Sequence, residues 1–240
     1  MIIRFQSVPA ADLKTYCGHR IWQKPKEGSI YAIGADVAEG TNGDASCASV
    51  IDCRTGMHVA CYWSNNIDTD NYAIELYKLG HWYNKAFICI EANNHGHSVI
   101  SHLSGAIGGL AYPNLYKRMT FDQFTQKRTK TVGFHTNGQT KPFLIENLKK
   151  ALKLGDLITA DGYTIREMNG FIRDNVTGRL GAPGRAHDDR VIALALAWEQ
   201  ARLITEGERL TDESAGPNIK YDPHTGFPTS ESFNFDDNIF

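Results

Sequence analysis

Three short apolar runs joined by turn-forming segments, followed by an abrupt change of period, restrict this chain to a mixed α/β architecture. The runs cover residues 29–36, 46–52 and 57–63, and the segments 39–44 and 54–56 separate them. Short runs of this kind, linked by such turns, predict neighbouring antiparallel strands. From Thr69 onward the apolar residues recur at helical spacing instead.

The rest of the pattern alternates helices with strands. A continuous apolar run, Ala86–Ile90, is typical of a strand that is buried on both faces. We expect a short strand at 114–119 and a loop or ribbon at 120–140. The expected helices cover 69–82 (capped by Asp68 or Asp70), 97–103, 141–154, 164–171 and 188–203, with a glycine-rich connection at 175–186.

The length of 240 residues fits one domain with a full core. We expect a linker or N-terminal extension at 1–28, the folded domain at 29–205 and an acidic, mobile tail at 206–240. No apolar run reaches the ~20 residues of a membrane span, and the N-terminus does not resemble a signal peptide. The five cysteines form no Cys-x-x-Cys pair, which argues against a disulfide framework or zinc knuckle and for a reduced, cytosolic protein.

The charge distribution is asymmetric. Residues 117–153 contain nine Lys and Arg against two Asp and Glu, whereas residues 204–240 contain two against eight. A basic middle beside an acidic tail is typical of proteins that bind nucleic acid, although a solvated helix face plus a tail explains the pattern equally well. The candidate phosphate contacts are Lys127, Arg128, Lys130 and Lys141, with Phe121, Phe124 and Phe134 interleaved. Each Phe fits a core position equally well.

Three acidic islands carry the chemistry. Asp36 ends the first strand, Glu91 ends the buried strand, and Asp188-Asp189 open the last helix. Each island also has a purely structural explanation, because Asp commonly caps turns and helices. Asp189 heads an i, i+4 line of small residues, Ala193, Ala197 and Ala201, that would let the helix lie close to the sheet. Asp189 is therefore slightly preferred as a ligand, with Asp188 as cap or second ligand.

Other polar residues near these islands are weaker candidates. Turn chemistry alone explains Glu39 and Asp44, and capping or solvation explains His95 and His97 better than ligation does. The three islands together supply hard oxygen ligands, which suit Mg²⁺ or Mn²⁺. Two such ions ~3.5–4 Å apart can activate water and stabilise a leaving 3′ oxygen. A metal-dependent phosphodiesterase site with Asp36 as the bridging ligand is the resulting hypothesis.

The segments Tyr31–Gly40, Ile90–Gly96 and His187–Ala195 resemble the nuclease domain of tailed-bacteriophage terminase large subunits. The stretch from Gly133 to Pro142 is also similar to that family's segment between its second and third acids. This resemblance covers residues 28–203. It implies an RNase H-like fold: a mixed sheet of three antiparallel strands, then alternating helices and strands, flanked by helices.

The resemblance also implies a function and partners. The activity would be endonucleolytic cutting of double-stranded concatemeric viral DNA during genome packaging, in the cytoplasm of the infected bacterium. The family's catalytic, metal-binding acids correspond to Asp36, Glu91 and the Asp188-Asp189 pair. The implied partners are DNA, a packaging ATPase domain, a portal and a terminase small subunit, with no membrane. Because no P-loop motif occurs here, we expect no ATPase activity.

Several rival functions share parts of this pattern. A Holliday-junction resolvase or transposase-like nuclease would use the same fold and the same three acids. A non-catalytic docking domain of the packaging motor would not need the acids at all. An actin-like ATPase or sugar kinase requires a second subdomain and a glycine-rich adenosine segment, neither of which is evident in the sequence.

Overall fold

The computed structural model describes residues 14–16, 18–38, 45–93, 95–106, 108–122, 127–173, 180–181 and 187–212. Glu39, Asp44, Phe124 and the tail from residue 213 therefore lie outside the described residues. No helix among the described segments is long and apolar enough to cross a membrane.

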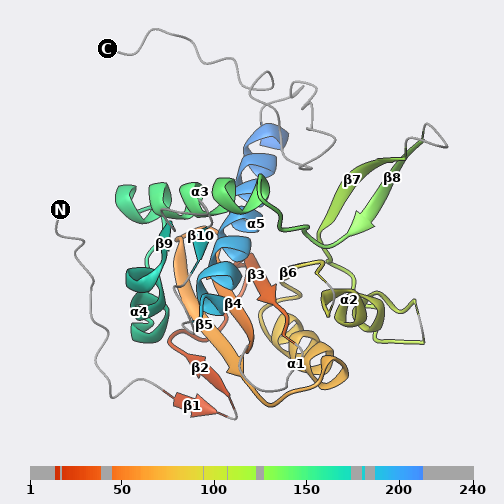
Figure 1. Cartoon of the computed structure of the whole chain (residues 1–240), viewed down its shortest axis with the longest axis horizontal. Helices are drawn as coiled ribbons and strands as arrows, with labels where there is room; N and C mark the ends of the chain where they lie inside the picture. The colour runs from red at the N-terminus through yellow and green to blue at the C-terminus, as the bar shows by residue number, and fades with distance from the viewer. Residues whose placement is uncertain are drawn as a thin grey trace, which may run out of the picture.

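A six-stranded mixed sheet forms the centre of the molecule (Figure 1). Its strand order is β1-β2-β5-β4-β3-β6, and each neighbouring pair is antiparallel except β3 and β6, which are parallel. The bounds are β1 Lys14–Tyr16, β2 His19–Ile21, β3 Tyr31–Asp36, β4 Ser46–Asp52, β5 Met57–Ser64 and β6 Phe87–Ile90. The three expected hairpin-linked strands are thus β3, β4 and β5.

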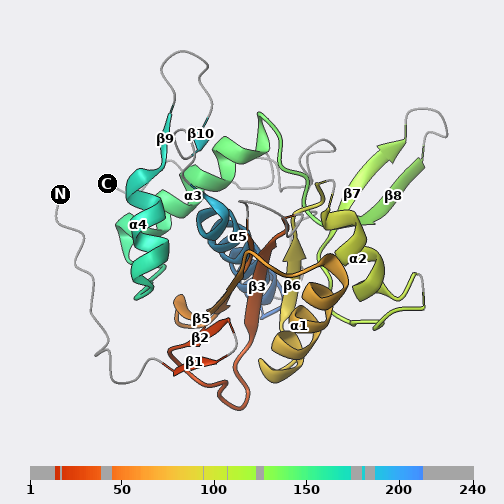
Figure 2. The same ribbon diagram turned by 60° about the horizontal axis from the view of Figure 1, so that its bottom comes forward.

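Helices cover both faces of this sheet (Figure 2). The helix bounds are α1 Thr69–Trp82, α2 Gly96–Ser104, α3 Thr140–Leu154, α4 Gly162–Gly170 and α5 Asp189–Asp212. On one face, α1 and α2 pack against Tyr31, Ile33 and Ala35 of β3. On the other face, α5 lies across β3, β4 and β6, with α3 and α4 packed beside it. Asp68 is the N-cap of α1, where its side chain accepts a hydrogen bond from the Asn71 amide.

Two segments differ from the expectations at the ends of the domain. The segment expected to be a linker contains β2, which pairs with β5 and extends the sheet. At the other end, α5 continues to Asp212 instead of ending at Leu203. β2 consists of only three residues, two of them polar, so its sequence alone does not indicate a strand. The division into three segments stays a prediction.

The strand expected at 114–119 does not join the central sheet as a strand. Leu115 forms only an isolated bridge with Ile88. The following residues form β7 (Lys117–Asp122), which pairs with β8 (Lys127–Val132) in a separate antiparallel hairpin. This hairpin projects from the body of the molecule (Figures 1 and 2). The ribbon alternative for 120–140 is therefore correct over its first part. The short strands β9 (Ile172–Arg173) and β10 (Leu180–Gly181) pair in the glycine-rich region.

Candidate active site

Asp36 and Glu91 end two neighbouring parallel strands. Ala35 pairs with Ile90, and the Glu91 amide donates a hydrogen bond to the Ala35 carbonyl at 2.9 Å. Side chains alternate across a sheet, and Ala32 and Cys89 belong to the core beneath α5. Asp36 and Glu91 have the same parity as these two residues. Both carboxyl groups therefore project from the face of the sheet that α5 covers.

The first turn of α5 brings the third acidic island to the same place. Gly34, two residues before Asp36, lies directly beneath this helix: a Cβ built there would be 2.1 Å from the Ala193 carbonyl oxygen and 2.2 Å from the Ala197 amide nitrogen. Ala193 and Ala197 are fully buried. The small residues on the i, i+4 line of Asp189 thus permit the close approach that the sequence predicted.

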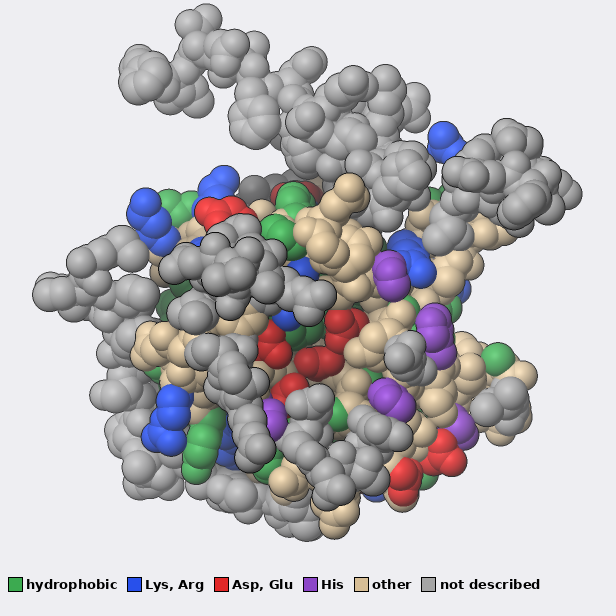
Figure 3. Space-filling view, viewed as in Figure 1, with side chains coloured by type: hydrophobic (Ala, Val, Ile, Leu, Met, Phe, Trp, Pro, Cys, Tyr) green, Lys and Arg blue, Asp and Glu red, His purple; other side chains and the backbone are tan. Residues whose placement is uncertain are grey.

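The pKa of Asp36 shows how close these acids are. It is raised well above its ordinary value, first by burial and then by the charge of Glu91 and a side-chain hydrogen bond with it. The charges of Asp189 and then Asp188 raise it further. The other three predicted acids thus all lie close enough to Asp36 to act on its carboxyl group. Figure 3 shows acidic side chains gathered in a hollow in the middle of this face, with histidines beside it.

The cluster fits a divalent cation in donor type and charge. Four carboxyl groups offer hard oxygen ligands, and the pKa of Asp36 is raised first by burial and then by the negative charge of its three acidic neighbours. Within the described residues, no group of three or more His, Cys, Asp or Glu side chains is already arranged as a metal site. The carboxyl groups are gathered but not converged on a common point.

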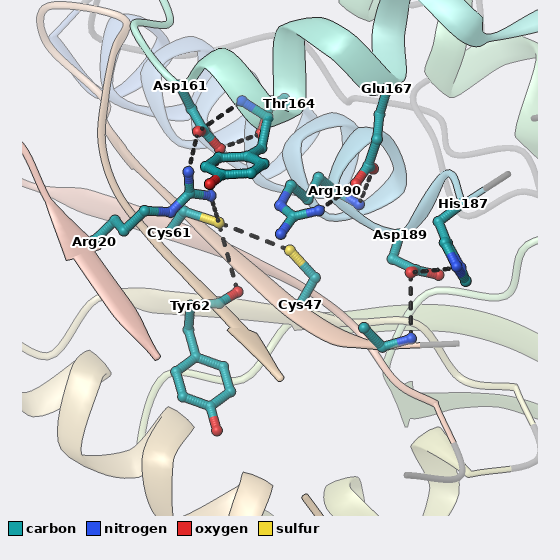
Figure 4. Close-up of polar contacts among 12 residues, drawn as sticks. Arg20, Cys47, Cys61, Tyr62, Asp161, Thr164, Glu167, His187, Asp189 and Arg190 are labelled. Atoms are coloured by element: carbon teal, nitrogen blue, oxygen red, sulfur yellow. Dashed lines mark hydrogen bonds and ion pairs between the residues drawn. The ribbon is translucent and has the colours of Figure 1, made fainter. Parts of the chain in front are cut away.

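Glu91 and Asp189 each have a polar partner that limits the rotation of the carboxyl group. The Asn93 amide nitrogen donates to a Glu91 carboxylate oxygen at 3.0 Å, and the Ala45 backbone amide donates to Asp189 at 3.2 Å. His187 Nδ1 lies 3.7 Å from the same Asp189 oxygen (Figure 4). The sequence pattern had assigned no role to Asn93. Its position two residues after Glu91, where the strand ends, was the available signal.

Lys141 is part of this cluster, not of the basic hairpin. Its Nζ lies 2.9 Å from Asp188 Oδ2, and both side chains are about a quarter exposed. The sequence had predicted Lys141 as a phosphate contact without indicating this ion pair. Lys141 lies in the first turn of α3, and this turn is beside the start of α5. Lys141 compensates the negative charge of Asp188. In the described structure, no lysine or arginine lies at hydrogen-bonding distance from Asp36 or Glu91.

The start of α5 is anchored by Arg190, another residue that the sequence did not single out as functional. Its guanidinium forms an ion pair with Glu167 of α4, and its backbone amide donates to the same carboxylate at 2.9 Å. The guanidinium also lies 4.8 Å from the centre of the Trp63 ring and 5.3 Å from that of Tyr163. These contacts fix the turn that carries Asp188 and Asp189.

The other predicted DNA contacts lie on the projecting hairpin. Arg128 and Lys130 are exposed on β8, where they pair with Phe121 and Met119 of β7. Directly opposed residues share one face of a hairpin, so both cations and the exposed Lys117 lie on the same face. Lys127 begins β8, opposite Asp122.

The weaker candidates and the aromatic residues have mixed outcomes. His95 occupies the N-cap position of α2 without a capping hydrogen bond from its side chain, and His97 is exposed on that helix. Phe134 is 2% exposed and packs in the core beneath α5, which agrees with the alternative that this Phe is a core residue.

A known protein family matches most of this chain. The family model described as "Terminase RNaseH-like domain" matches residues 33–200. The large terminase subunit of Thermus virus P23-45 is 27% identical over 175 residues, which are 71% of this chain and 32% of that protein. The chain therefore spans about a third of the length of this curated relative.

Solved structures show the same fold. The large terminase nuclease of thermophilic phage G20c, with bound magnesium, has a TM-score of 0.60 and 23% identity, covering 78% of this chain and 90% of that one. The nuclease domain of the Thermus phage P74-26 large terminase has a TM-score of 0.57 and 22% identity, covering 79% and 88%. The predicted fold class and the resemblance seen in the sequence are confirmed.

Proposed function

Because the chain belongs to the terminase RNaseH-like domain family, we propose that it is the nuclease domain of a terminase large subunit. It would cut double-stranded, concatemeric DNA during viral genome packaging. The observation that carries this proposal is the gathering of Asp36, Glu91, Asp188 and Asp189 around one position. Placing carboxyl groups that repel each other side by side lowers the stability of a fold, and a domain that only docked on a partner would not require this arrangement.

We assign Asp36, Glu91 and Asp189 as ligands of divalent cations, Mg²⁺ or Mn²⁺, with Asp188 as a further ligand or helix cap. The G20c relative was solved with bound magnesium, which supports this choice of metal. Two ions are proposed, and Asp36 would be the central residue of the set that holds them. When bound, such ions supply neutralisation of the carboxylates, activation of the attacking water and stabilisation of the leaving 3′ oxygen.

The chain's own residues have distinct tasks in this proposal. Asn93 holds one oxygen of Glu91 by its hydrogen bond, which limits the rotation of this carboxylate. Lys141 holds Asp188, which limits the net negative charge that DNA phosphates meet as they approach. Arg128 and Lys130 on the hairpin would contact the phosphate backbone, whose charge their side chains complement.

The wider assignments are proposals from the family and from the relative's length. The packaging ATPase, the portal and the small subunit would be the protein partners, and the host cytoplasm the location. The segment in hand is not expected to hydrolyse ATP.

Cleavage of supercoiled plasmid DNA in Mn²⁺ or Mg²⁺ tests the proposal. Wild type should convert plasmid to nicked and linear forms, and EDTA should stop the reaction. Asp36→Asn should reduce the rate at least 100-fold, since it removes the shared ligand. Glu146→Gln is the matched control, because Glu146 is an exposed acid on α3 outside the cluster; it should cut at the wild-type rate.

The same variants separate the rival functions. Equal rates for Asp36→Asn and wild type would exclude the acidic cluster as the active site, and absence of metal-dependent cleavage would favour the docking-domain alternative. A strong preference for four-way junctions over linear duplex would favour the resolvase alternative. Calorimetric titration with Mn²⁺ provides an independent readout: binding should be lost in Asp36→Asn and retained in Glu146→Gln.

A further inference from the structure

An apolar groove lies between α3, α4 and the start of α5, away from the acidic side chains. It encloses about 290 Å³. Ile145 and Leu148 of α3 and Val191 of α5 are almost fully buried at its base, and Ile165 and Met168 of α4 form the opposite wall. If the apolar side chains of the three helices packed against each other completely, no space of this size would remain between them. The groove is therefore a place where an apolar segment could be received.

The rim of this groove is positively charged. Lys149 and Lys153 line it from α3 and are exposed, and Lys150 lies exposed between them. The stems of such side chains can cover apolar surface while their charged ends stay in water. An occupant that fits must therefore combine apolar side chains with negative charge.

The last ten residues of the sequence have this combination. Residues 231–240 contain Phe233, Phe235, Ile239 and Phe240, together with Glu231, Asp236 and Asp237, and no Lys or Arg. The aromatic residues are spaced two apart at 233 and 235, so they share one side of an extended segment. The acids follow directly after them.

The length of the chain permits the contact. Val191 and Asp212 are 21 positions apart on α5, which corresponds to about 32 Å at 1.5 Å per residue. The 18 residues from 213 to 230 can span up to ~60 Å when extended. The end of the chain can therefore return along α5 to the groove near its first turn.

We propose that residues 231–240 dock in this groove within the same molecule, with Phe233 and Phe235 in the apolar space and Asp236 and Asp237 against Lys149 and Lys153. The groove wall also contains Phe171, whose ring lies 5.7 Å from Lys141 Nζ. Lys141 in turn holds Asp188. Docking would therefore contact the outer side of the turn that carries the candidate ligands.

Photo-crosslinking of the full chain tests this docking. Phe235 is replaced by photoreactive benzoylphenylalanine, the protein is irradiated at low concentration, and crosslinked peptides are identified by mass spectrometry. The expected crosslinks join residue 235 to peptides that contain Ile145–Lys153 or Ile165–Phe171, in species with the mass of the monomer.

A charge exchange makes the test specific. Lys149→Glu with Lys153→Glu should lower the crosslink yield at least fivefold, because like charges then face each other. Adding Asp236→Lys and Asp237→Lys should restore most of the yield. Lys24→Glu, at an exposed lysine in the segment before β3, is the control and should leave the yield unchanged. Circular dichroism verifies that each variant is folded.

Three results would overturn the proposal. These are crosslinks that map outside the groove, crosslinks that join two copies of the chain, and a yield that does not respond to Lys149 and Lys153. None of them bears on the plasmid-cleavage result, so failure of the docking proposal and failure of the proposed nuclease function are distinguishable.

Discussion

Asp36 is the residue at which stability and the proposed function oppose each other. Burial and three neighbouring acids raise its pKa, so the folded chain resists ionising this carboxyl group. A group with a raised folded-state pKa stabilises fully below its unfolded pKa and loses that contribution as the pH rises through the folded value. At neutral pH, the metal-free protein should therefore be less stable than it would be with an uncharged side chain at this position, because the unfolded chain ionises Asp36 more readily than the folded chain does.

Asp36→Asn should consequently be more stable than wild type at pH 7 in EDTA, although the proposed function expects it to cut DNA far more slowly. The reason is that an amide keeps the shape and removes the charge. Urea unfolding followed by fluorescence should give a higher midpoint for the variant, and the gain should shrink as the pH is lowered. Asp156→Asn, at an exposed acid, should show no gain. A lower midpoint for Asp36→Asn would contradict this view of the cluster.

We expect a second effect of pH on stability from His58, which is not part of the acidic cluster. Its ring is 1% exposed, its Nδ1 lies 2.8 Å from Thr159 Oγ1, and burial lowers its pKa to about 4 despite the opposing charge of Asp161; Arg20 adds to the lowering. A depressed histidine pKa contributes stability that is present above pH ~6.5 and is lost as the pH falls toward 4.

His58→Asn should therefore flatten the acid side of the stability profile. Between pH 7 and pH 4, the lowered pKa of His58 should reduce the free energy of unfolding of wild type by as much as about 3 kcal/mol. The free energy of unfolding of the variant should fall by correspondingly less over the same range. Guanidinium unfolding midpoints at both pH values measure the difference. Parallel profiles for the two proteins would exclude His58 as a source of acid sensitivity.

At the scale of elements, the contact between α5 and β3 determines where the third acid lies. The backbone of the helix, not its side chains, sits against Gly34. Any larger residue at this position must push α5 outward, and Asp189 moves with it. The helix is held from its other side by α3 and by the Arg190–Glu167 pair.

Gly34→Ala should destabilise the protein by about 3 kcal/mol or more, because overpacking here meets backbone atoms that cannot rotate away. Chemical unfolding measures the loss. Gly138→Ala is the matched control: a Cβ there meets nothing within 4 Å, so its effect should stay within about 0.5 kcal/mol. If Gly34→Ala were equally mild, α5 could not lie as close to the sheet as the structure places it.

At the scale of the whole molecule, the hairpin β7–β8 extends the surface that DNA could meet beyond the acidic cluster (Figure 1). Arg128 and Lys130 lie on one face of it. Binding to phosphates releases counterions, so each contact contributes to the salt dependence of affinity.

Arg128→Ala with Lys130→Ala should weaken binding to duplex DNA about tenfold and reduce the slope of log K against log salt by ~2. Fluorescence anisotropy at several salt concentrations measures both, in the presence of Ca²⁺ or EDTA to prevent cleavage. Lys24→Ala serves as a lysine outside the hairpin. An unchanged slope in the double variant would remove the hairpin from the interface.

Much of the architecture was predictable because local pattern and tertiary context agree. The bounds of β4 and α1 match the expected ones, since strong apolar periodicity and clear turns surround them. The acids at strand ends were also recognisable, because an ionised carboxylate directly after a buried apolar run is costly unless a cation or hydrogen bonds compensate its charge. The alternation of side chains along β3 and β6 then decides that Asp36 and Glu91 share a face.

What the sequence could not predict depends on contacts between distant segments. The Lys141–Asp188 pair joins residues 47 positions apart, and Arg190–Glu167 joins two helices whose packing no local pattern reveals. β2 forms because β5 offers an edge with which it can pair, not because the short segment His19–Ile21 favours a strand by itself. The roles of the four acids as ligands stay a prediction from sequence.

The placement of Asp189 on the last described helix has a consequence for synthesis of the protein. Asp36 and Glu91 emerge from the ribosome early, but the cluster lacks its remaining members until more than 90 further residues have been made. At ~5–20 residues per second, this interval lasts several seconds or more. On the proposed function, a chain that ends before Asp188 should therefore not cut the nucleic acid around it, because it lacks two of the four candidate ligands.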